Sequence, residues 1–200
     1  TPTPKSFGVF WNSSSSLKII VQPLPGTTYK AFFGNDGLTF NDSTSEFADS
    51  IIVNNLTDDS IFYFRIRAKN ELGYSDFSEV LAAAVSGSAP SVLIVNGFDR
   101  SSTGNTYNFI RQHSSAFKNN GYSFSSAAND AVMQGIVSLQ HYSIVDYILG
   151  EESTADETFN STEQELIKSF LKTGGKLFIS GAEIAWDLDY KGSSADKDFI

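Results

Sequence analysis

The pattern of hydrophobic and polar positions along the chain changes near residue 86. Before that point, short runs of β-type alternation are separated by turn residues, and no helical period is present. Short strands at this spacing are typical of a β-sandwich. Beyond it, continuous apolar runs alternate with segments of helical period, which is typical of a parallel sheet covered by helices. The sequence therefore predicts an all-β domain at residues 1–86, a linker at 87–90 and an α/β domain at 91–200.

Six strands are expected in the first domain, at residues 7–11, 17–22, 28–34, 51–54, 61–69 and 78–84. The turns between them contain Gly, which supplies positive φ, and Pro, which cannot pair. In the fifth strand Arg65 and Arg67 share one face, and the other face is apolar, formed by Phe62, Phe64, Ile66 and Ala68. Such a strand has one face in a core and the other in solvent. Aromatic side chains such as Tyr63 and Phe77 are expected to pack against the neighbouring domain.

The segment from Leu56 to Ser75 resembles the E-to-F corner and strand F of fibronectin type III domains. Phe62 stands where that family has its corner tyrosine, and Val21 stands where it usually has a tryptophan. Modules of this family mostly space and present other domains, so the resemblance implies a spacer role. The first domain has no His cluster, no paired carboxylates and no Arg-Gly-Asp triplet.

The second domain is predicted to have four strands, at residues 92–95, 122–126, 144–149 and 176–180. Helices are expected between them at 107–119, 130–140 and 162–172. Ser161 with Gln164 is expected to form a capping box in front of the third helix, and Gly174 with Gly175 to end it. This alternation is the order of a doubly wound sheet, and it predicts a flavodoxin-like domain with strand order 2-1-3-4.

In such a sheet ligands bind beyond the carboxyl ends of the strands, where the winding reverses. Three loops follow these ends, at 96–100, 150–154 and 180–187. They contain the candidate catalytic residue Glu183 and the candidate ligand-binding residues Asp99, Arg100, Glu151, Glu152, Ser153, Ser180 and Asp187. Crowded carboxylates suit proton transfer or a hard cation such as calcium, and no other cofactor is expected. The same acids can equally be solvated helix caps, and Asp99 with Arg100 a structural ion pair.

Charge and composition narrow the classes of partner. The net charge of −9 repels phosphate backbones, so nucleic acid is not expected. No apolar run approaches the roughly 20 residues that cross a bilayer, and the start TPTPKS suggests that a segment was removed upstream. Without cysteine there is no disulfide and no thiol nucleophile, which is compatible with the cytosol or with a bacterial envelope.

Three segments, Val92–Arg100, Gly150–Thr154 and Gly174–Leu188, together resemble one bacterial family. The chain is similar to secreted multidomain proteins of Bacteroidetes, often labelled xanthan lyase or N-acetylmuramoyl-L-alanine amidase. In these proteins a fibronectin type III module precedes a domain of class I glutamine-amidotransferase-like fold. The resemblance implies secretion or residence in the cell envelope, a glycan or peptidoglycan ligand, and further domains in a longer parent. It leaves open whether the α/β domain is complete at residue 200.

The amidotransferase comparison can be tested on the expected strand-to-helix turn at 180–183. That fold places a Cys nucleophile on such a turn, whereas this turn has Ala182 at its centre. The two histidines, His113 and His141, are expected to be structural. We therefore carry three hypotheses: a binding or scaffolding domain with an acidic rim, a hydrolase or lyase in which Glu183 does acid or base work with the rim carboxylates, and a rigid spacer for a catalytic domain elsewhere.

Overall fold

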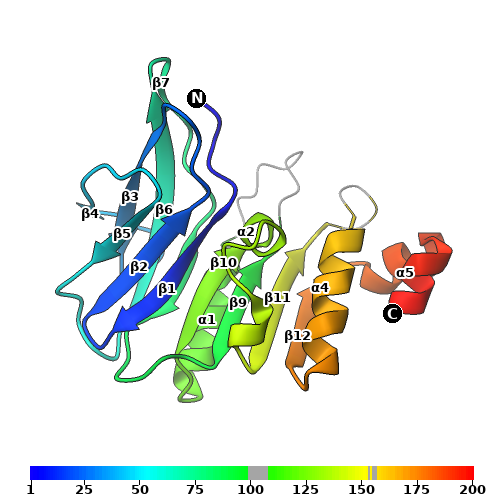
Figure 1. Ribbon diagram of the computed structural model, residues 1–200. Coiled ribbons are helices and arrows are strands. Elements are labelled where there is room, and N and C mark those ends of the chain that lie inside the picture. Colours follow the sequence, from blue (N-terminus) through cyan, green and yellow to red (C-terminus); the bar gives the residue numbers. More distant parts are fainter. Residues whose placement is uncertain (99–107, 153, 155–156) are drawn as a thin grey trace.

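A computed structural model describes residues 1–98, 108–152, 154 and 157–200 (Figure 1). The N-terminal part is a sandwich of antiparallel strands. Its first layer contains β1 (Phe7–Ser13), β2 (Ser16–Val21) and β5 (Ser50–Val53). Its second layer contains β4 (Asp42–Ser43), β3 (Thr28–Gly34), β6 (Ile61–Asn70), β7 (Gly73–Tyr74) and β8 (Leu81–Ala84). All six predicted strands are present, and the two-residue strands β4 and β7 were not predicted.

The alternation predicted for β6 is confirmed on its apolar face, because Phe64, Ile66 and Ala68 are fully buried between the two layers. The opposite face is not simply charged and solvated. The guanidinium of Arg65 lies 3.9 Å from the ring centroid of Phe77, and that of Arg67 lies 4.0 Å from that of Tyr74. Phe77 therefore packs on its own sheet, and its expected contact with the next domain stays a prediction. Arginine covers aromatic faces well because its planar cation is attracted to the ring.

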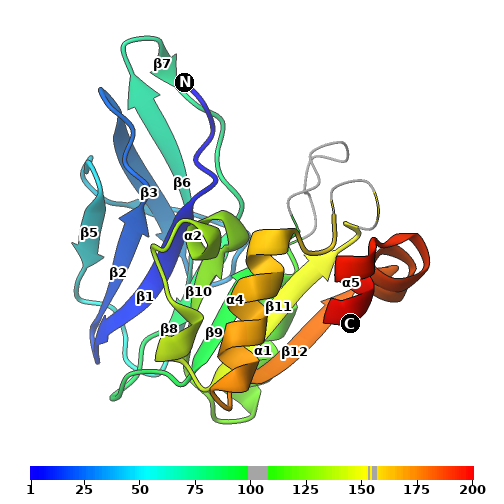
Figure 2. The same ribbon diagram turned by 45° about the vertical axis from the view of Figure 1, so that its right-hand side comes forward.

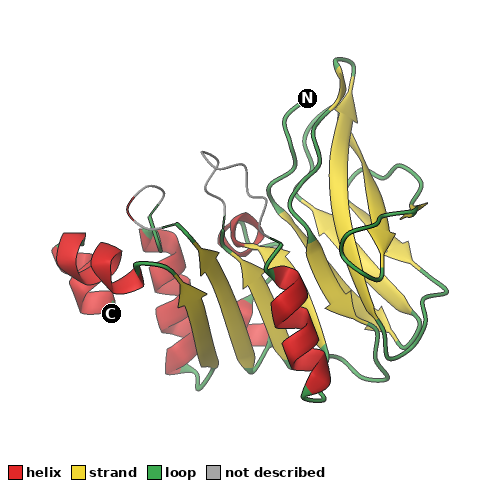
Figure 3. Ribbon diagram, turned by 180° about the vertical axis from the view of Figure 1, so that it is seen from behind, coloured by secondary structure: helices red, strands yellow, loops and turns green. Residues whose placement is uncertain are grey.

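The C-terminal part is built on four parallel strands, β9 (Val92–Asn96), β10 (Phe124–Ala128), β11 (Ile144–Gly150) and β12 (Lys176–Gly181). They lie side by side as β10-β9-β11-β12, which is the predicted order 2-1-3-4. Two longer helices, α1 (Ile110–Asn119) and α4 (Ser161–Lys172), lie on opposite faces of this sheet (Figures 1 and 3). No described helix is long and apolar enough to cross a membrane.

Two of the helix predictions need correction. Residues 130–140 do not form one helix but the short α2 (Asn129–Met133) and the 3₁₀ turn η2 (Leu139–His141). Gly135 separates them with a φ of +75°, a left-handed conformation that ends a helix and that favours glycine. The cap of α4 is Asn160 rather than Ser161. Its side chain accepts from the backbone N–H of Glu163, whose carboxylate accepts in turn from the N–H of Asn160.

The two predicted domains share one sheet. Strand β1 pairs antiparallel with β10, so a single seven-stranded sheet runs in the order β12-β11-β9-β10-β1-β2-β5 (Figure 2). The parallel sheet is thus a continuation of the first layer of the sandwich. The predicted picture of two domains in series must therefore be revised at this junction, where backbone hydrogen bonds join the two parts.

A third apolar cluster fills the space between the two parts. The sandwich contributes Tyr63, Ala82 and Ala84, and the α/β part contributes Val92, Ile94, Ile110, Phe124 and Ile148. Strand β8 is buried on both faces, because Leu81 and Ala83 point into the sandwich core while Ala82 and Ala84 point into this junction cluster. The hydroxyl of Tyr63 lies 2.9 Å from that of Ser114 on α1, which confirms that Tyr63 packs against the neighbouring domain.

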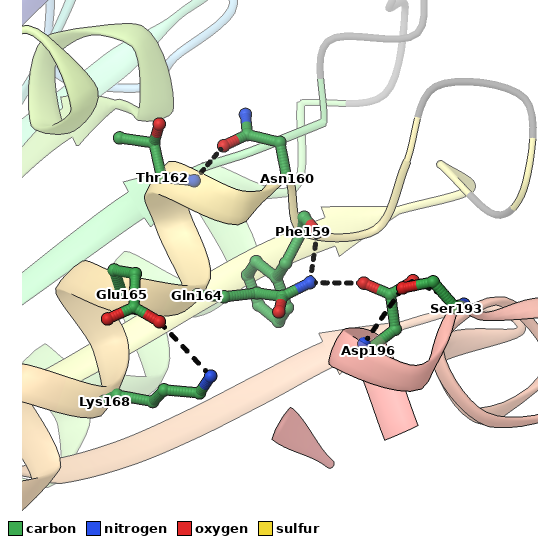
Figure 4. Close-up of polar contacts among 8 residues, drawn as sticks. All are labelled: Phe159, Asn160, Thr162, Gln164, Glu165, Lys168, Ser193 and Asp196. Carbon is green, nitrogen blue, oxygen red and sulfur yellow. Dashed lines mark hydrogen bonds and ion pairs between the residues drawn. The ribbon is translucent and has the colours of Figure 1, made fainter. Parts of the chain in front are cut away.

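The last residues form a small helical unit, η3 (Trp186–Lys191) and α5 (Ser194–Phe199), which docks beside the N-terminus of α4 (Figure 4). The buried side-chain amide of Gln164 donates to the carbonyl of Phe159 at 3.0 Å and to the carboxylate of Asp196 at 2.6 Å. Asp196 also accepts from the hydroxyl of Ser193, the cap of α5. The hydrogen bond from Gln164 contributes most to lowering the pKa of Asp196, and the bonds from Ser193 add to it.

We expect the docking of α5 to weaken in acid. Since the folded-state pKa of Asp196 lies below its ordinary value of 3.8, its ionised form stabilises the docked unit above that pH. This contribution is lost as the pH falls through the folded pKa. Carboxyl NMR titration should show a midpoint below 3.8 for Asp196, and Gln164→Ala should move it upward. The exposed ion pair between Lys168 and Glu165 lies nearby on α4 (Figure 4). The control Lys172→Ala, an exposed change in the last turn of α4, should leave the midpoint unchanged; equal effects of the two variants would contradict this assignment.

Candidate functional site

The carboxyl ends of the three predicted site strands lie at one edge of the sheet (Figure 2). In the ladders Asn96 of β9 pairs with Ile148 of β11, and Gly150 of β11 pairs with Gly181 of β12. The backbone N–H of Ala182 donates to the carbonyl of Gly150 at 2.7 Å. The loops that follow β9, β11 and β12 therefore start side by side, because the register of a parallel sheet aligns the strand ends.

Two glycines allow these loop starts to pack closely. Gly150 has a φ of +54°, and a Cβ added there would lie 2.5 Å from the ring of Phe98. A Cβ on Gly97 would lie 2.8 Å from the ring of Tyr147. Side chains at either position would push the loops after β9 and β11 apart, so glycine sets their spacing.

The described part of the predicted site lies along this edge. Glu151 is exposed, Glu152 is buried, and Ser180 is half-buried at the end of β12. Asp187 accepts from the backbone N–H of Thr158 at 2.7 Å, so its carboxylate ties the loop before α4 to the segment after β12. Asp99, Arg100 and Ser153 lie outside the described residues. Asp187 is thus engaged in a structural hydrogen bond, which sequence reasoning did not assign to it.

Glu183 holds a distinctive backbone position. It lies on the sharp turn between β12 and the helical segment that follows, its φ is +59°, and its carbonyl accepts from the N–H of Asp187 at 2.9 Å. A long side chain in the left-handed region is strained by an amount on the order of 1–3 kcal/mol, and such strain clusters at functional sites. The predicted centre of this turn was Ala182, whereas the strained position is one residue later and carries an exposed carboxylate.

An aromatic pair beyond this turn was missed at the sequence level. Trp186 and Tyr190 stack with ring centroids 4.3 Å apart and ring planes at 26°. The two side chains are 46% and 66% exposed. The ammonium of Lys191 lies 5.4 Å from each centroid. They lie in the π-helical turn η3, a rare conformation that often accompanies function. The sequence feature that could have predicted this pair is two aromatic residues four positions apart in a segment rich in acidic residues.

The two histidines, which were expected to be structural, lie away from this edge. His141 is exposed at the end of η2, and His113 on α1 contacts Asp146 of β11 rather than the rim. In the described ranges, no group of three or more His, Asp or Glu side chains could hold a metal ion.

Comparison with known proteins gave limited similarity. No protein-family model and no curated protein matches the chain. Among solved structures, it is similar to the chicken CNTN1 FN1-FN3 domains, with 16% identity, a TM-score of 0.38 and coverage of 44% of this chain and 33% of that one. A fibronectin type III domain of human contactin 1 gives 17% identity, a TM-score of 0.39, and coverage of 44% and 81%. The FN5 domain of Drosophila Lar gives 18% identity, a TM-score of 0.36, and coverage of 43% and 97%.

Proposed function

We propose that this chain is a glycan-binding part of a secreted or envelope protein. In this proposal the sandwich is a fibronectin type III module that supports a flavodoxin-like, amidotransferase-like α/β domain, and the α/β domain contacts the glycan at the carboxyl edge of its sheet. The observation that carries the proposal is the exposed Trp186–Tyr190 stack, seven residues or fewer from Glu183 in the chain.

The chemistry of the two groups supports a carbohydrate ligand. A sugar ring has apolar C–H faces and a rim of hydroxyl donors, so it is bound by a flat aromatic surface with carboxylate acceptors beside it. Trp and Tyr supply large, rigid contact areas with few rotatable bonds, and Glu183 and Asp189 are exposed acceptors in the same segment. Because the chain carries a net charge of −9, we expect neutral glycans to bind better than anionic ones.

The strained backbone at Glu183 favours one second function, that of a hydrolase or lyase. A carboxylate held on a strand-to-helix turn occupies the place where related folds position a reacting group. In that case Glu183 would move a proton to or from the glycan. Its partner carboxylate would come from the loops after β9 and β11, where Asp99, Glu151 or Glu152 was predicted to act.

We expect Trp186→Ala to weaken the binding of neutral oligosaccharides or peptidoglycan fragments at least about tenfold, which corresponds to roughly 1.4 kcal/mol. Thermal-shift and titration measurements on the whole chain, with and without calcium, would detect this. Tyr74→Ala is a matched control, because Tyr74 is 50% exposed on the distant sandwich. The proposal would be refuted if wild type and Trp186→Ala bound glycans with equal affinity, or if no glycan shifted the melting temperature. The hypothesis of a rigid spacer would then remain.

Glu183→Gln separates binding from chemistry, because the amide preserves shape but cannot take up a proton. If the domain only binds, this variant should retain glycan affinity and wild-type protein should release no product. If it is a hydrolase or lyase, product release by wild type should be lost in Glu183→Gln while the fold, measured by circular dichroism, stays intact.

A further inference from the structure

A pocket of about 470 Å³ lies on the α1 side of the parallel sheet, away from the proposed glycan edge. One wall is the last two turns of α1, with His113 and Phe117, and the opposite wall is Phe178 on β12. Asp146 of β11 and Tyr122 also line the pocket. On this side of the sheet, β11 and β12 have none of the described helices in front of them (Figure 3). The volume is in the range of small-molecule sites.

Asp146 is the anomaly in this pocket. The neighbouring positions of β11 on the same face, Ile144 and Ile148, belong to the junction cluster, so an apolar residue would suit this position. Asp146 is nevertheless a carboxylate that is 1% exposed. Its Oδ2 lies 2.6 Å from Nδ1 of His113, and its Oδ1 makes no hydrogen bond with any described residue. A buried carboxylate oxygen without a donor costs free energy that a stable fold would avoid, so a ligand is the natural source of that donor.

The polar groups that face the pocket are the carboxylate of Asp146, the imidazole of His113 and the side-chain amides of Gln112 and Asn120. When Nδ1–H of His113 donates to Asp146, its Nε2 becomes a second acceptor. Phe117, Tyr122 and Phe178 contribute ring surfaces, and the last turn of α1 adds the partial negative charge of a helix C-terminus. No Ser, Thr, Cys or Lys is among the described lining residues. Its chemistry therefore suits binding of a cation with an apolar body.

We propose that this pocket binds small organic cations, in which an ammonium or amidinium group donates to Oδ1 of Asp146 and an apolar body lies between Phe117 and Phe178. The net charge of −9 raises the local concentration of such cations. This site is independent of the proposed glycan edge, because its residues come from α1, from the segment between α1 and β10, and from the middle of β11 and β12.

The probe that tests this is benzamidine, compared with its neutral isostere benzamide, on the whole chain at neutral pH. Two-dimensional NMR should show saturable shifts centred on the amides of Asn120, Tyr122 and Phe178, and benzamidine should bind at least tenfold more tightly than benzamide. Asp146→Asn should remove this preference. Asp189→Asn, an exposed change of the same kind, should retain it.

Ala116→Leu is a second variant that does not alter the buried charge. Ala116 lines the pocket and is exposed, so the larger side chain should fill the site without disturbing the core, and benzamidine affinity should fall at least tenfold. The proposal is overturned if wild type shows no saturable shifts, or if Asp146→Asn and Ala116→Leu both bind benzamidine as wild type does. It is also overturned if a concentration-dependent dimer excludes benzamidine and persists in Asp146→Asn, because a second copy would then cover the pocket.

Discussion

Phe124→Ala should destabilise the whole chain by about 3–5 kcal/mol, the cost of removing a fully buried aromatic side chain. Phe124 lies on β10, is completely buried, and packs in the junction cluster together with residues from the sandwich. Because β10 also pairs with β1, the substitution should lower the stability of both the sandwich and the α/β part. Chemical denaturation should give one transition, displaced to lower denaturant concentration, rather than two.

The two tryptophans allow each side of the junction to be followed separately. Trp11 lies on β1 in the sandwich, and Trp186 follows β12 in the α/β part. Replacing one or the other by Phe leaves a single tryptophan as the fluorescence reporter, and the two midpoints should coincide and shift together in Phe124→Ala. Leu72→Ala, at a side chain that is 80% exposed, should change stability by less than about 0.5 kcal/mol. A shift confined to the Trp186 signal would show that the two parts unfold independently.

Ser126→Ala should cost about 2–4 kcal/mol, an unusually large effect for a serine. The hydroxyl of Ser126 lies 2.9 Å from the backbone N of Ala82, from which it accepts, and 2.5 Å from the carbonyl O of Ala82, to which it donates. Ser126 on β10 and Ala82 on β8 are both fully buried. Removing the hydroxyl therefore leaves the backbone N–H and the carbonyl of Ala82 without this partner. Each such group costs about 1–3 kcal/mol. The measurement is the free energy of unfolding from denaturant titration.

Two comparisons make the Ser126 result specific. Ser91→Ala, at an exposed position just before β9, should be close to neutral. In Ser126→Ala, hydrogen exchange at the amide of Ala82 should accelerate more than at the amides of β3. If Ser126→Ala lowers the free energy of unfolding by less than about 0.5 kcal/mol, water replaces the hydroxyl. The hydrogen bonds between Ser126 and Ala82 would then contribute little to stability.

The junction also bears on the spacer hypothesis. Three contacts join the segments on either side of the predicted linker. Strand β1 pairs with β10, and the hydroxyl of Ser126 bonds to the backbone of Ala82. The indole N–H of Trp11 donates to the carbonyl of Ser86 at 2.7 Å. A linker with so many contacts on either side holds its two domains in one orientation. If the chain presents a glycan site on a longer protein, that site therefore points in a direction that the sandwich sets.

Local patterns sufficed for most of the elements. The strands of the sandwich, the apolar strands β9, β11 and β12, and helix α4 were all predicted close to their observed ranges. Their order 2-1-3-4 followed from the alternation of strands with helices, because right-handed crossovers leave few ways to wind such a chain. The adjacency of the loops after β11 and β12 followed in turn, since parallel strands end at the same edge.

Where the predictions failed, a contact between distant segments decided the outcome. Strand β10, with the sequence Phe-Ser-Ser-Ala-Ala, gave a weak apolar signal because four of its five residues are small, and the sequence did not show that Ser126 bonds to the backbone of Ala82 on β8. The predicted helix at 130–140 was interrupted because Gly135 takes a left-handed conformation that periodicity does not report.

The sequence by itself thus determined most of the elements, their order and the sheet edge at which the loops after β11 and β12 begin, because these depend on periodicities within one segment. Only the tertiary structure decided that β1 joins β10 into one sheet, that Asp146 meets His113, and that Glu183 carries the strained backbone of its turn. Each of these depends on which distant residues come within contact distance. That is set by how whole layers pack, and it leaves no regular spacing along the chain.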